Sequence, residues 1–441
     1  MGDFSREREP TGDASGAGRR RGLERRQVLK TTAGGAAGLS LAGCLDTYGA
    51  IVGSDDTEPI TIGVLAPGPD SDTTGRSNVR GAQIAVDELN DNGGILGRDV
   101  ELVVGDSNRS AREGSREYQR LILEEGADVT LGVATSEVLE GILDDVAEQE
   151  TIHLTAGAVT MTPSELIGEQ YDKYKYHFRV GPLNGHDLAT HQIDFLNAMG
   201  GELGWDSFAV LVEDYIWTEP LLDVYEDELA GDVTMQEQYP PATDDFTDIY
   251  DEIASTGADA VLEAVAHTGA TSLVDWNSSQ QPFGFGGIHM PMQSPSYYDQ
   301  VGGDCEYAVG YTNVTPTTAH TDKTQPFITE YQNRHNGNSP IYTGYSSYDA
   351  VNVFAQAAEQ AGTLDADELV STLEGISVTG TTGTIEFYGA DHEFAHDVVY
   401  GEDNVNPVYF QWVEDENGDG VQNVIWPDGQ AEGDYVEPDW L

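Results

Sequence analysis

Positive charge, cysteine and long apolar runs are all scarce in this sequence of 441 residues. Only 20 Lys and Arg residues face 78 Asp and Glu residues, and the formal net charge of −58 makes nucleic acids and anionic lipid headgroups poor partners. The two cysteines, Cys44 and Cys305, exclude a disulfide framework. Beyond residue 43 no window of about 18 uncharged apolar residues occurs, so the body contains no candidate transmembrane helix.

The many carboxylates are spread along the chain and are not gathered in one run. They alternate with Val, Ile, Leu, Tyr and Gly and leave an ordinary hydrophobic periodicity, which indicates a folded protein with an acidic surface. Such surfaces are typical of proteins that stay hydrated in concentrated salt, where the Debye length falls to about 3 Å and self-repulsion is largely screened. We therefore expect an extremely halophilic, archaeal source.

The first 43 residues differ from the rest because they hold eight of the 20 basic residues. Arg25-Arg26 precede a weakly apolar stretch, residues 31–42, which ends in Leu41-Ala42-Gly43-Cys44. This order resembles a twin-arginine (Tat) export signal with a lipobox, which implies lipidation of Cys44. The alternative is a short transmembrane helix, but about 12 residues rich in Gly and Ala cannot span a bilayer core that needs about 20.

The chain is accordingly divided into a signal (1–43), a flexible tether (44–58) and a folded body. Once Cys44 is lipidated, Cys305 has no intramolecular partner, and we expect it to be a packed thiol. A protein exported with this signal lies on the extracellular face of the cell membrane and is held there by its lipid.

Strand and helix patterns alternate through the body. Ile60–Leu65 is an apolar strand, Val79–Asn90 has helical spacing and Val100–Val104 is a second strand, so the three form a βαβ unit. Two series of this kind follow one another, which predicts an α/β protein with two doubly wound, Rossmann-like lobes. The other elements expected in these series are helices at 113–125, 138–149, 187–199, 220–229 and 246–255 and strands at 129–133, 152–155, 208–212, 234–239 and 260–264.

The C-terminal third is expected to contain one long helix, residues 348–360, followed by short strands. The strands are placed at 384–387, 408–413 and 421–426. Asn417-Gly418 indicates a hairpin between the last two.

Several segments, in order along the body, resemble periplasmic binding proteins of ABC transporters. They are IGVLAPGPD, RGAQIAVDELNDNGGILGRDVELVVGD, YKYHFRVGP, DYIWTEP, YPPATDDFTDIYDEI and ADAVLEAV, and the likeness runs from about Ile60 to Leu441. The similarity is to the branched-chain amino acid and amide type (type I, Leu/Ile/Val-binding-like). It implies two lobes, joined by three crossovers, that close on a small solute and catalyse nothing.

The resemblance also implies where the lobes begin and end. Crossovers are expected near Arg179–Pro182, near Asn313–Pro316 and after about Gly383. The first lobe then comprises 59–181 and 313–385, and the second lobe comprises 182–312 and 386–441.

In that family, loops after strands of the first lobe hold a ligand carboxylate through hydroxyl and backbone N–H groups, because helix N-termini supply oriented donors. The matching loops are Ala134-Thr135-Ser136 and residues 156–160, although Ser136 also stands where plain helix capping is expected. For Tyr215 the alternative is a packed loop, and for His267 and His289 it is a structural histidine. The resemblance places ligand-binding residues at Thr135, Ser136, Gly157, Ala158, Thr160, Tyr215, His267 and His289.

Two departures from the family pattern bear on the solute. Val159 stands where amino acid binders tend to carry a hydroxyl residue, with Thr160 as the nearest replacement, and no glutamate for an α-ammonium group stands at the position of His289. Branched-chain amino acids, amides or urea-like compounds, and organic acids therefore all stay open as solutes. We expect no cofactor, a monomer, and permease subunits as partners; a ligand-sensing receptor ectodomain is the alternative.

His392-Glu393-Phe394-Ala395-His396 matches the zincin pattern in its letters, and a zinc-dependent hydrolase is the alternative from another class. That chemistry requires a helix, which brings two histidines one turn apart onto one face. Gly389 before the motif and the residues after it favour a strand or turn, and no third metal ligand is evident. We therefore expect no catalytic zinc at this segment.

Overall fold

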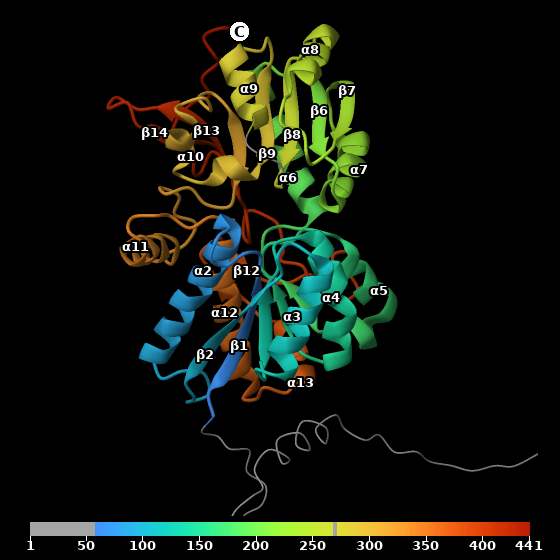
Figure 1. Ribbon diagram of the computed structural model, residues 1–441, viewed down its shortest axis with the longest axis vertical. Coiled ribbons are helices and arrows are strands. Elements are labelled where there is room, and N and C mark those ends of the chain that lie inside the picture. Colours follow the sequence, from blue (N-terminus) through green and yellow to red (C-terminus); the bar gives the residue numbers. More distant parts are fainter. Residues whose placement is uncertain (1–57, 268–270) are drawn as a thin grey trace, which may run out of the picture. The chain divides into compact units, whose positions relative to one another are not determined.

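A computed structural model describes residues 58–267 and 271–441 (Figure 1). The predicted signal, the lipidation site Cys44 and all but the last residue of the tether lie outside this part of the chain. Within it, no helix combines the length and the apolar character needed to cross a bilayer.

The first lobe is built on a five-stranded parallel sheet with the strand order β2-β1-β3-β4-β5. Strand β1 (Ile60–Ala66) is buried along its whole length, as expected where helices cover both faces of a parallel sheet. The other elements of this lobe are β2 (Val100–Asp106), β3 (Val129–Gly132), β4 (His153–Thr155), β5 (His177–Arg179), α2 (Thr73–Asp91), α3 (Ala111–Leu123), α4 (Ser136–Gln149), α5 (Thr162–Tyr174), α11 (Thr324–Arg334), α12 (Tyr342–Ala361), α13 (Ala366–Leu373) and the pair β11 (Val378–Thr379) and β12 (Thr384–Ile385).

Helices α2 and α12 lie against each other with their first turns side by side. The Thr343 hydroxyl donates to the Thr74 carbonyl oxygen at 2.9 Å, so both helices begin at the same edge of the lobe. The contact is close because glycines meet there: a Cβ on Gly81 would lie 2.0 Å from the carbonyl oxygen of Gly344. Two helix N-termini therefore share one edge of the first lobe.

The second lobe has a seven-stranded sheet in the order β14-β13-β10-β9-β8-β6-β7. Five strands are parallel, and the hairpin of β13 (Val408–Glu414) and β14 (Gly420–Trp426) adds two antiparallel strands beside β10. Gly418 has a φ of 89°, as the predicted hairpin requires. The other elements are α6 (Gly185–Leu203), β6 (Ser207–Glu213), η1 (Ile216–Thr218), α7 (Glu219–Glu228), β7 (Asp232–Tyr239), α8 (Thr247–Thr256), β8 (Ala260–Val265), α9 (Thr271–Ser279), β9 (Gly284–His289), η2 (Met290–Gln293), α10 (Tyr297–Val301) and β10 (Val309–Thr312).

The chain passes between the lobes at residues 180–184, which follow β5, and at residues 313–323, which follow β10. The third passage differs from the predicted boundary after Gly383. Asp397 forms a parallel bridge with Arg179 at the edge of the first sheet, and Val398 pairs with Phe387. Residues 386–398 therefore belong with the first lobe, because the Asp397 carboxylate must reach the buried Arg179 guanidinium.

The predicted α/β architecture of two Rossmann-like lobes is confirmed by these two sheets. Cys305 is fully buried in the core of the second lobe, as expected for a packed thiol, and forms no disulfide within the described residues. Burial raises the pKa of this thiol. The side chain therefore behaves as an apolar core residue.

Candidate functional site

Both lobes present polar loops at the carboxyl ends of their parallel strands. In open α/β sheets, ligands bind in the crevice outside these ends. In the first lobe the loops follow β1, β2, β3 and β4, and in the second lobe they follow β6, β8 and β9. The predicted ligand-binding residues all lie on these loops or directly beside them.

Thr135 begins α4 with an unpaired hydroxyl. It is the N-cap residue and is buried, yet it makes no capping hydrogen bond, and its Oγ1 has no partner among the described residues. The N-cap position of α4 is therefore Thr135, whereas the sequence suggested the next residue, Ser136. A buried hydroxyl without a partner costs free energy unless a ligand or water supplies one.

The loop before Thr135 is strained and touches the neighbouring loop. Val133 has a φ of 59°, which is unfavourable for a β-branched residue and is held by hydrogen bonds to Leu65 and from Ala158. A Cβ on Gly157 would lie 2.7 Å from the Cα of Ala134, so glycine permits the two loops to meet. The structure thus brings the loop that leads to Thr135 and the loop of Gly157 and Ala158 together into one patch.

Arg179 supports this patch from beneath. Its side chain is fully buried, and its Nε donates to Asp397 Oδ1 at 2.9 Å. The two terminal nitrogens donate to the carbonyl oxygens of Ala158 and Thr160. Because a buried charge persists only where it is paired and hydrogen-bonded, the guanidinium fixes the backbone of the loop after β4.

The hydroxyl of Thr160 is occupied elsewhere. Its Oγ1 donates to Glu140 Oε1 at 2.7 Å, and the Thr162 hydroxyl donates to the same carboxylate oxygen at 2.8 Å. The side chain of Thr160 therefore does not join Thr135, although its backbone belongs to the same loop as Gly157.

In the second lobe, Glu213 organises the predicted residues Tyr215 and His267. Glu213 ends β6, is fully buried, and accepts hydrogen bonds from the Trp217 indole at 2.6 Å and from the His267 backbone N–H at 2.9 Å. Its Oε1 also lies 2.7 Å from His267 Nδ1. Burial raises the pKa of Glu213, but the contacts with His267 and Trp217 outweigh it and hold the pKa below its ordinary value.

Tyr215 covers this cluster and faces the first lobe. Its ring packs on the imidazole of His267, with the ring centroids 4.4 Å apart. Burial raises the pKa of Tyr215, the charges of Glu213 and Glu137 raise it further, and Arg109 opposes the rise. Glu137 and Arg109 belong to first-lobe loops and helices, so Tyr215 stands where the two lobes approach each other.

His289 lies deeper, with the contacts of a structural histidine. It is fully buried and accepts the Met292 backbone N–H at Nδ1 over 3.2 Å, while Nε2 has no partner among the described residues. Burial lowers its pKa to about 3, so the ring is neutral. Its ring centroid lies 5.8 Å from that of Tyr297.

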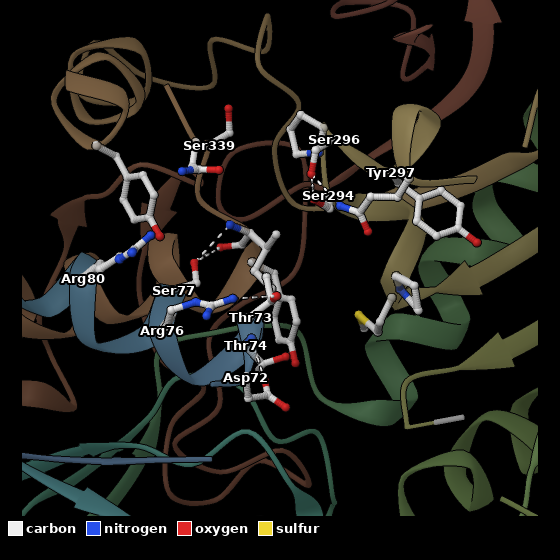
Figure 2. Close-up of a pocket in the computed structure, with 18 of the residues that line it drawn as sticks. Asp72, Thr73, Thr74, Arg76, Ser77, Arg80, Ser294, Ser296, Tyr297 and Ser339 are labelled. Carbon is white, nitrogen blue, oxygen red and sulfur yellow. Dashed lines mark hydrogen bonds between the residues drawn. The ribbon is translucent and has the colours of Figure 1, made fainter. Parts of the chain in front are cut away.

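A cavity of about 850 Å³ opens between the first turn of α2 and the segment formed by η2 and α10 (Figure 2). Figure 2 shows Arg76 and Arg80 on one side of it and Ser294, Ser296 and Tyr297 on the other. We call it the arginine cavity, because its wall contains three arginines. Its lining includes Asp72, Thr73, Thr74, Arg76, Arg80, Arg109, Ala266, Met290, Ser294, Ser296, Tyr297, Asp299, Ile341 and Tyr342.

A second cavity, of about 650 Å³, has the opposite character. Five carboxylates line it together with His186 and the two threonines that bind Glu140, and we call it the acidic cavity. The lining carboxylates are Glu140, Glu165, Glu219, Asp223 and Glu393. No group of three or more possible ligand side chains within the described residues could hold a metal ion.

The zincin-like segment does not form a helix. Residues 391–396 are turns, His396 has a φ of 63°, and its Nε2 lies 3.1 Å from Glu374 Oε1. The His392 ring stacks on Tyr388 instead, with the centroids 4.2 Å apart. The two histidines are therefore not presented on one helical face, which the zinc chemistry requires.

Sequence reasoning missed Glu213 and the arginines of the cavity. A signal was present for Glu213, because a charged residue ends an otherwise apolar buried strand, FAVLVE. For Arg76, Arg80 and Arg109 the signal was their rarity in an acid-rich chain. None of the eight predicted ligand-binding residues lines the arginine cavity. Ala266 and Met290, which stand next to His267 and His289, do line it, and Thr160 lines the acidic cavity.

Comparisons with known proteins agree with this architecture. The chain is 25% identical over 374 residues to the Leu/Ile/Val-binding protein homolog 7 of Brucella abortus, which covers 81% of this chain and 88% of the relative. It is similar in fold to a branched-chain amino acid transporter substrate-binding protein of Streptococcus pneumoniae, solved with isoleucine, with a TM-score of 0.69, 18% identity, and coverage of 84% of this chain and 100% of that one.

A further solved structure is a solute-binding protein of an ABC transporter from Rhodopseudomonas palustris in complex with 3,4-dihydroxybenzoic acid. Its TM-score is 0.69, with 16% identity and coverage of 87% of this chain and 99% of that one. The family model described as periplasmic binding protein matches residues 59–403, which span both lobes. The chain belongs to the periplasmic binding protein family.

Proposed function

We propose that this protein is the extracellular, lipid-anchored substrate-binding protein of an ABC uptake transporter. The observation that carries the proposal is the arginine cavity, which is walled by loops of both lobes at the carboxyl ends of their parallel strands. Its volume, about 850 Å³, suits a small metabolite. The relatives, a Leu/Ile/Val-binding protein homolog and a branched-chain amino acid transporter substrate-binding protein, support the same role.

In this proposal the solute binds between the open lobes, which then close by rotation about the crossovers. The closed state is favoured only because it has the higher affinity for the solute. The Thr135 hydroxyl, the backbone of Ser136, Gly157 and Ala158, and Tyr215 on His267 lie outside the lining of the arginine cavity. In this proposal they reach the solute when the lobes close, from the first lobe and from the second respectively. Thr160 and His289 act indirectly, through the loops that they hold.

The proposal includes the fate of the N-terminal segment. The Tat-like signal exports the folded chain, Cys44 carries the lipid, and residues 44–58 tether a monomer to the membrane near its permease. The acidic surface supports function in molar salt, which screens the self-repulsion of a chain with a net charge of −58.

The test is a thermal-shift and calorimetric screen of the purified protein in molar salt. The compounds are branched-chain amino acids, amides, urea and short or aromatic organic acids. A solute at a hundred times its dissociation constant is expected to stabilise the fold by about 2.7 kcal/mol. If no compound class shifts the unfolding transition, the proposed function is rejected.

Thr135→Val tests the site itself. Because the Thr135 hydroxyl has no partner in the described chain, its loss is expected to leave stability unchanged or slightly higher. Solute affinity is expected to fall roughly three- to tenfold, since a hydrogen bond contributes about 0.5–1.5 kcal/mol. Thr372→Val on α13, away from both cavities, is the matched control and leaves affinity unchanged.

A further inference from the structure

Positive charge is concentrated at the arginine cavity. The chain has only 20 basic residues, and eight of them lie in the first 43 residues, so three of the remaining twelve line one cavity. Asp72 and Asp299 are the only carboxylates in the described wall. In a chain with 78 acidic residues, this wall holds more arginines than carboxylates, and its positive charge attracts an anion.

Arg76 and Arg80 have no carboxylate partner within the described residues. They stand one helical turn apart on α2, and both are half-buried. Arg76 makes only long contacts of 3.4 Å, to the Asp70 carbonyl oxygen and the Thr73 hydroxyl, and neither arginine forms an ion pair within the described residues. Guanidinium groups that remain without a carboxylate in so acidic a chain are available to a ligand.

Arg109 adds a third donor at the same wall. It bonds Asp72 Oδ2 through Nη2 at 2.8 Å and through Nε at 3.2 Å, which leaves Nη1 without a hydrogen bond among the described residues. Asp72 is fully engaged, because its Oδ1 caps α2 by accepting the Thr74 N–H at 2.8 Å. Asp72 is therefore not free to bind a cationic group of a solute.

Two helix N-termini reinforce the three arginines. α2 begins at Thr73 and α12 begins at Tyr342, and both first turns line the cavity. No side chain caps the N-terminus of α12. The positive ends of two helix dipoles therefore point at the same space as the guanidinium groups.

The opposite wall supplies no buried acid for an ammonium group. Ser294, Ser296 and Tyr297 are neutral, and Asp299 is exposed. Glu213, a buried carboxylate at the end of β6 in the same lobe, does not line the cavity and is bound by His267 and Trp217. An α-amino acid would bring a positive charge into a wall whose only carboxylate outside the Asp72–Arg109 pair is the exposed Asp299.

We propose that the arginine cavity selects a small organic acid that carries a carboxylate and no amino group, held by Arg76 and Arg80 with Arg109 beside them. This inference rests on the proposed function and narrows its solute from three classes to one. The recognition resides in charge-assisted hydrogen bonds from guanidinium to carboxylate, which are stronger than neutral ones.

The first experiment compares ligands that differ only in charge. Calorimetry in molar salt measures 3-methylpentanoate against isoleucine, which adds the ammonium group, and against 3-methylpentanamide, which removes the negative charge. Succinate against succinamide and benzoate against benzamide extend the series to other shapes. In at least one set the carboxylate is expected to bind ten- to hundredfold more tightly than its matched amide, about the value of a charge-assisted hydrogen bond.

The second experiment removes the arginines that have no partner. Arg76→Gln and Arg80→Gln are each expected to weaken the carboxylate about ten- to hundredfold while leaving the unfolding transition in place, because neither change strands a buried acid. Arg112→Gln is the matched control: Arg112 is exposed on α3, lies outside both cavities, and is expected to leave affinity unchanged.

The outcomes separate this inference from the proposed function. Tight binding of isoleucine or of an amide, unaffected by Arg76→Gln and Arg80→Gln, would overturn the inference and leave a binding protein. Failure of the whole panel to bind would count against the proposed function and the inference together. Carboxylate binding that both glutamine variants weaken and Arg112→Gln does not would support both.

Discussion

The arginine cavity and the acidic cavity differ far more in charge than in volume. The first, of about 850 Å³, has three arginines against two aspartates in its wall, and the second, of about 650 Å³, has five carboxylates and no arginine or lysine. Acidic residues outnumber basic residues 78 to 20 in the whole chain, so the acidic wall matches the average surface. Because acids are abundant throughout this chain, a cluster of arginines is stronger evidence for a binding site than a cluster of acids.

If the few arginines of this chain stand where they have binding partners, then substitution of the most buried one, Arg179, should lower the free energy of unfolding most. Arg179→Met leaves Asp397 buried without its partner and frees the loop of Ala158 and Thr160. We expect a loss of about 3–5 kcal/mol in the free energy of unfolding, measured by denaturant titration in molar salt. The double variant Arg179→Met/Asp397→Leu should recover most of it, and a loss below about 1 kcal/mol in the single variant would contradict the comparison.

A buried acid is the counterpart of the buried arginine. Its effect on stability can be measured by varying the pH. Burial raises the pKa of Glu263 to about 8. The unfolded state releases this proton near pH 4.5 and the folded state retains it, so the contribution of Glu263 to stability falls as pH rises between these values, by about 1.4 kcal/mol per pH unit. Glu263→Gln should remove this slope. The difference in free energy of unfolding between Glu263→Gln and the wild type should therefore grow by about 2–3 kcal/mol from pH 6 to pH 8.

Chemical denaturation at a series of pH values measures the effect of Glu263. Glutamine keeps the shape of the side chain and can still accept from the Ser272 hydroxyl, which lies 2.9 Å from Glu263 Oε2. Glu252→Gln on the exposed face of α8 is the control and should keep the wild-type slope. Parallel pH profiles for the wild type and Glu263→Gln would show that the buried acid is not neutral.

The wall of the arginine cavity can also be displaced without touching its charges. A Cβ in Gly81→Ala would meet the Gly344 carbonyl oxygen at 2.0 Å and force α2 away from α12. We expect a loss of about 1–3 kcal/mol in stability, as for other overpacked contacts, together with weaker solute binding. Gly168→Ala, where an added Cβ meets nothing within 4 Å, should instead stabilise α5 by up to about 1 kcal/mol.

The smallest effect is expected in the acidic cavity. Glu165→Gln and Glu393→Gln change its charge at exposed positions, and surface changes of this kind usually stay within about 0.5 kcal/mol. Calorimetry should find solute affinity within about twofold of the wild type. A larger change would mean that the acidic cavity takes part in binding and that the charge contrast between the cavities does not locate the site.

Much of the fold was predictable because local pattern decides it. The apolar run at Ile60, the helical spacing after Val79 and the turn at Asn417-Gly418 each specify an element from neighbouring residues alone. The prediction missed α5 (Thr162–Tyr174), whose apolar positions are few and whose backbone is non-helical at Gln170. Such a helix depends on packing against its neighbours more than on its own periodicity.

The candidate site was predictable only where a loop follows a strand. Order along the chain was enough to place Thr135, Gly157 and Tyr215 on such loops. It did not show that Thr160 binds Glu140 or that His289 is buried and accepts the Met292 N–H, because those contacts depend on where side chains point after folding.

The composition and periodicity of this chain establish an acidic, two-lobed α/β protein, since charge and spacing are properties of the sequence as written. The arginine cavity is a product of tertiary structure. Arg76 lies close to Arg109 and across from Ser294 only when two glycines let α2 meet α12 and the chain has passed between the lobes. Residues about 200 positions apart share this wall, and no local pattern records the long-range packing that brings them together.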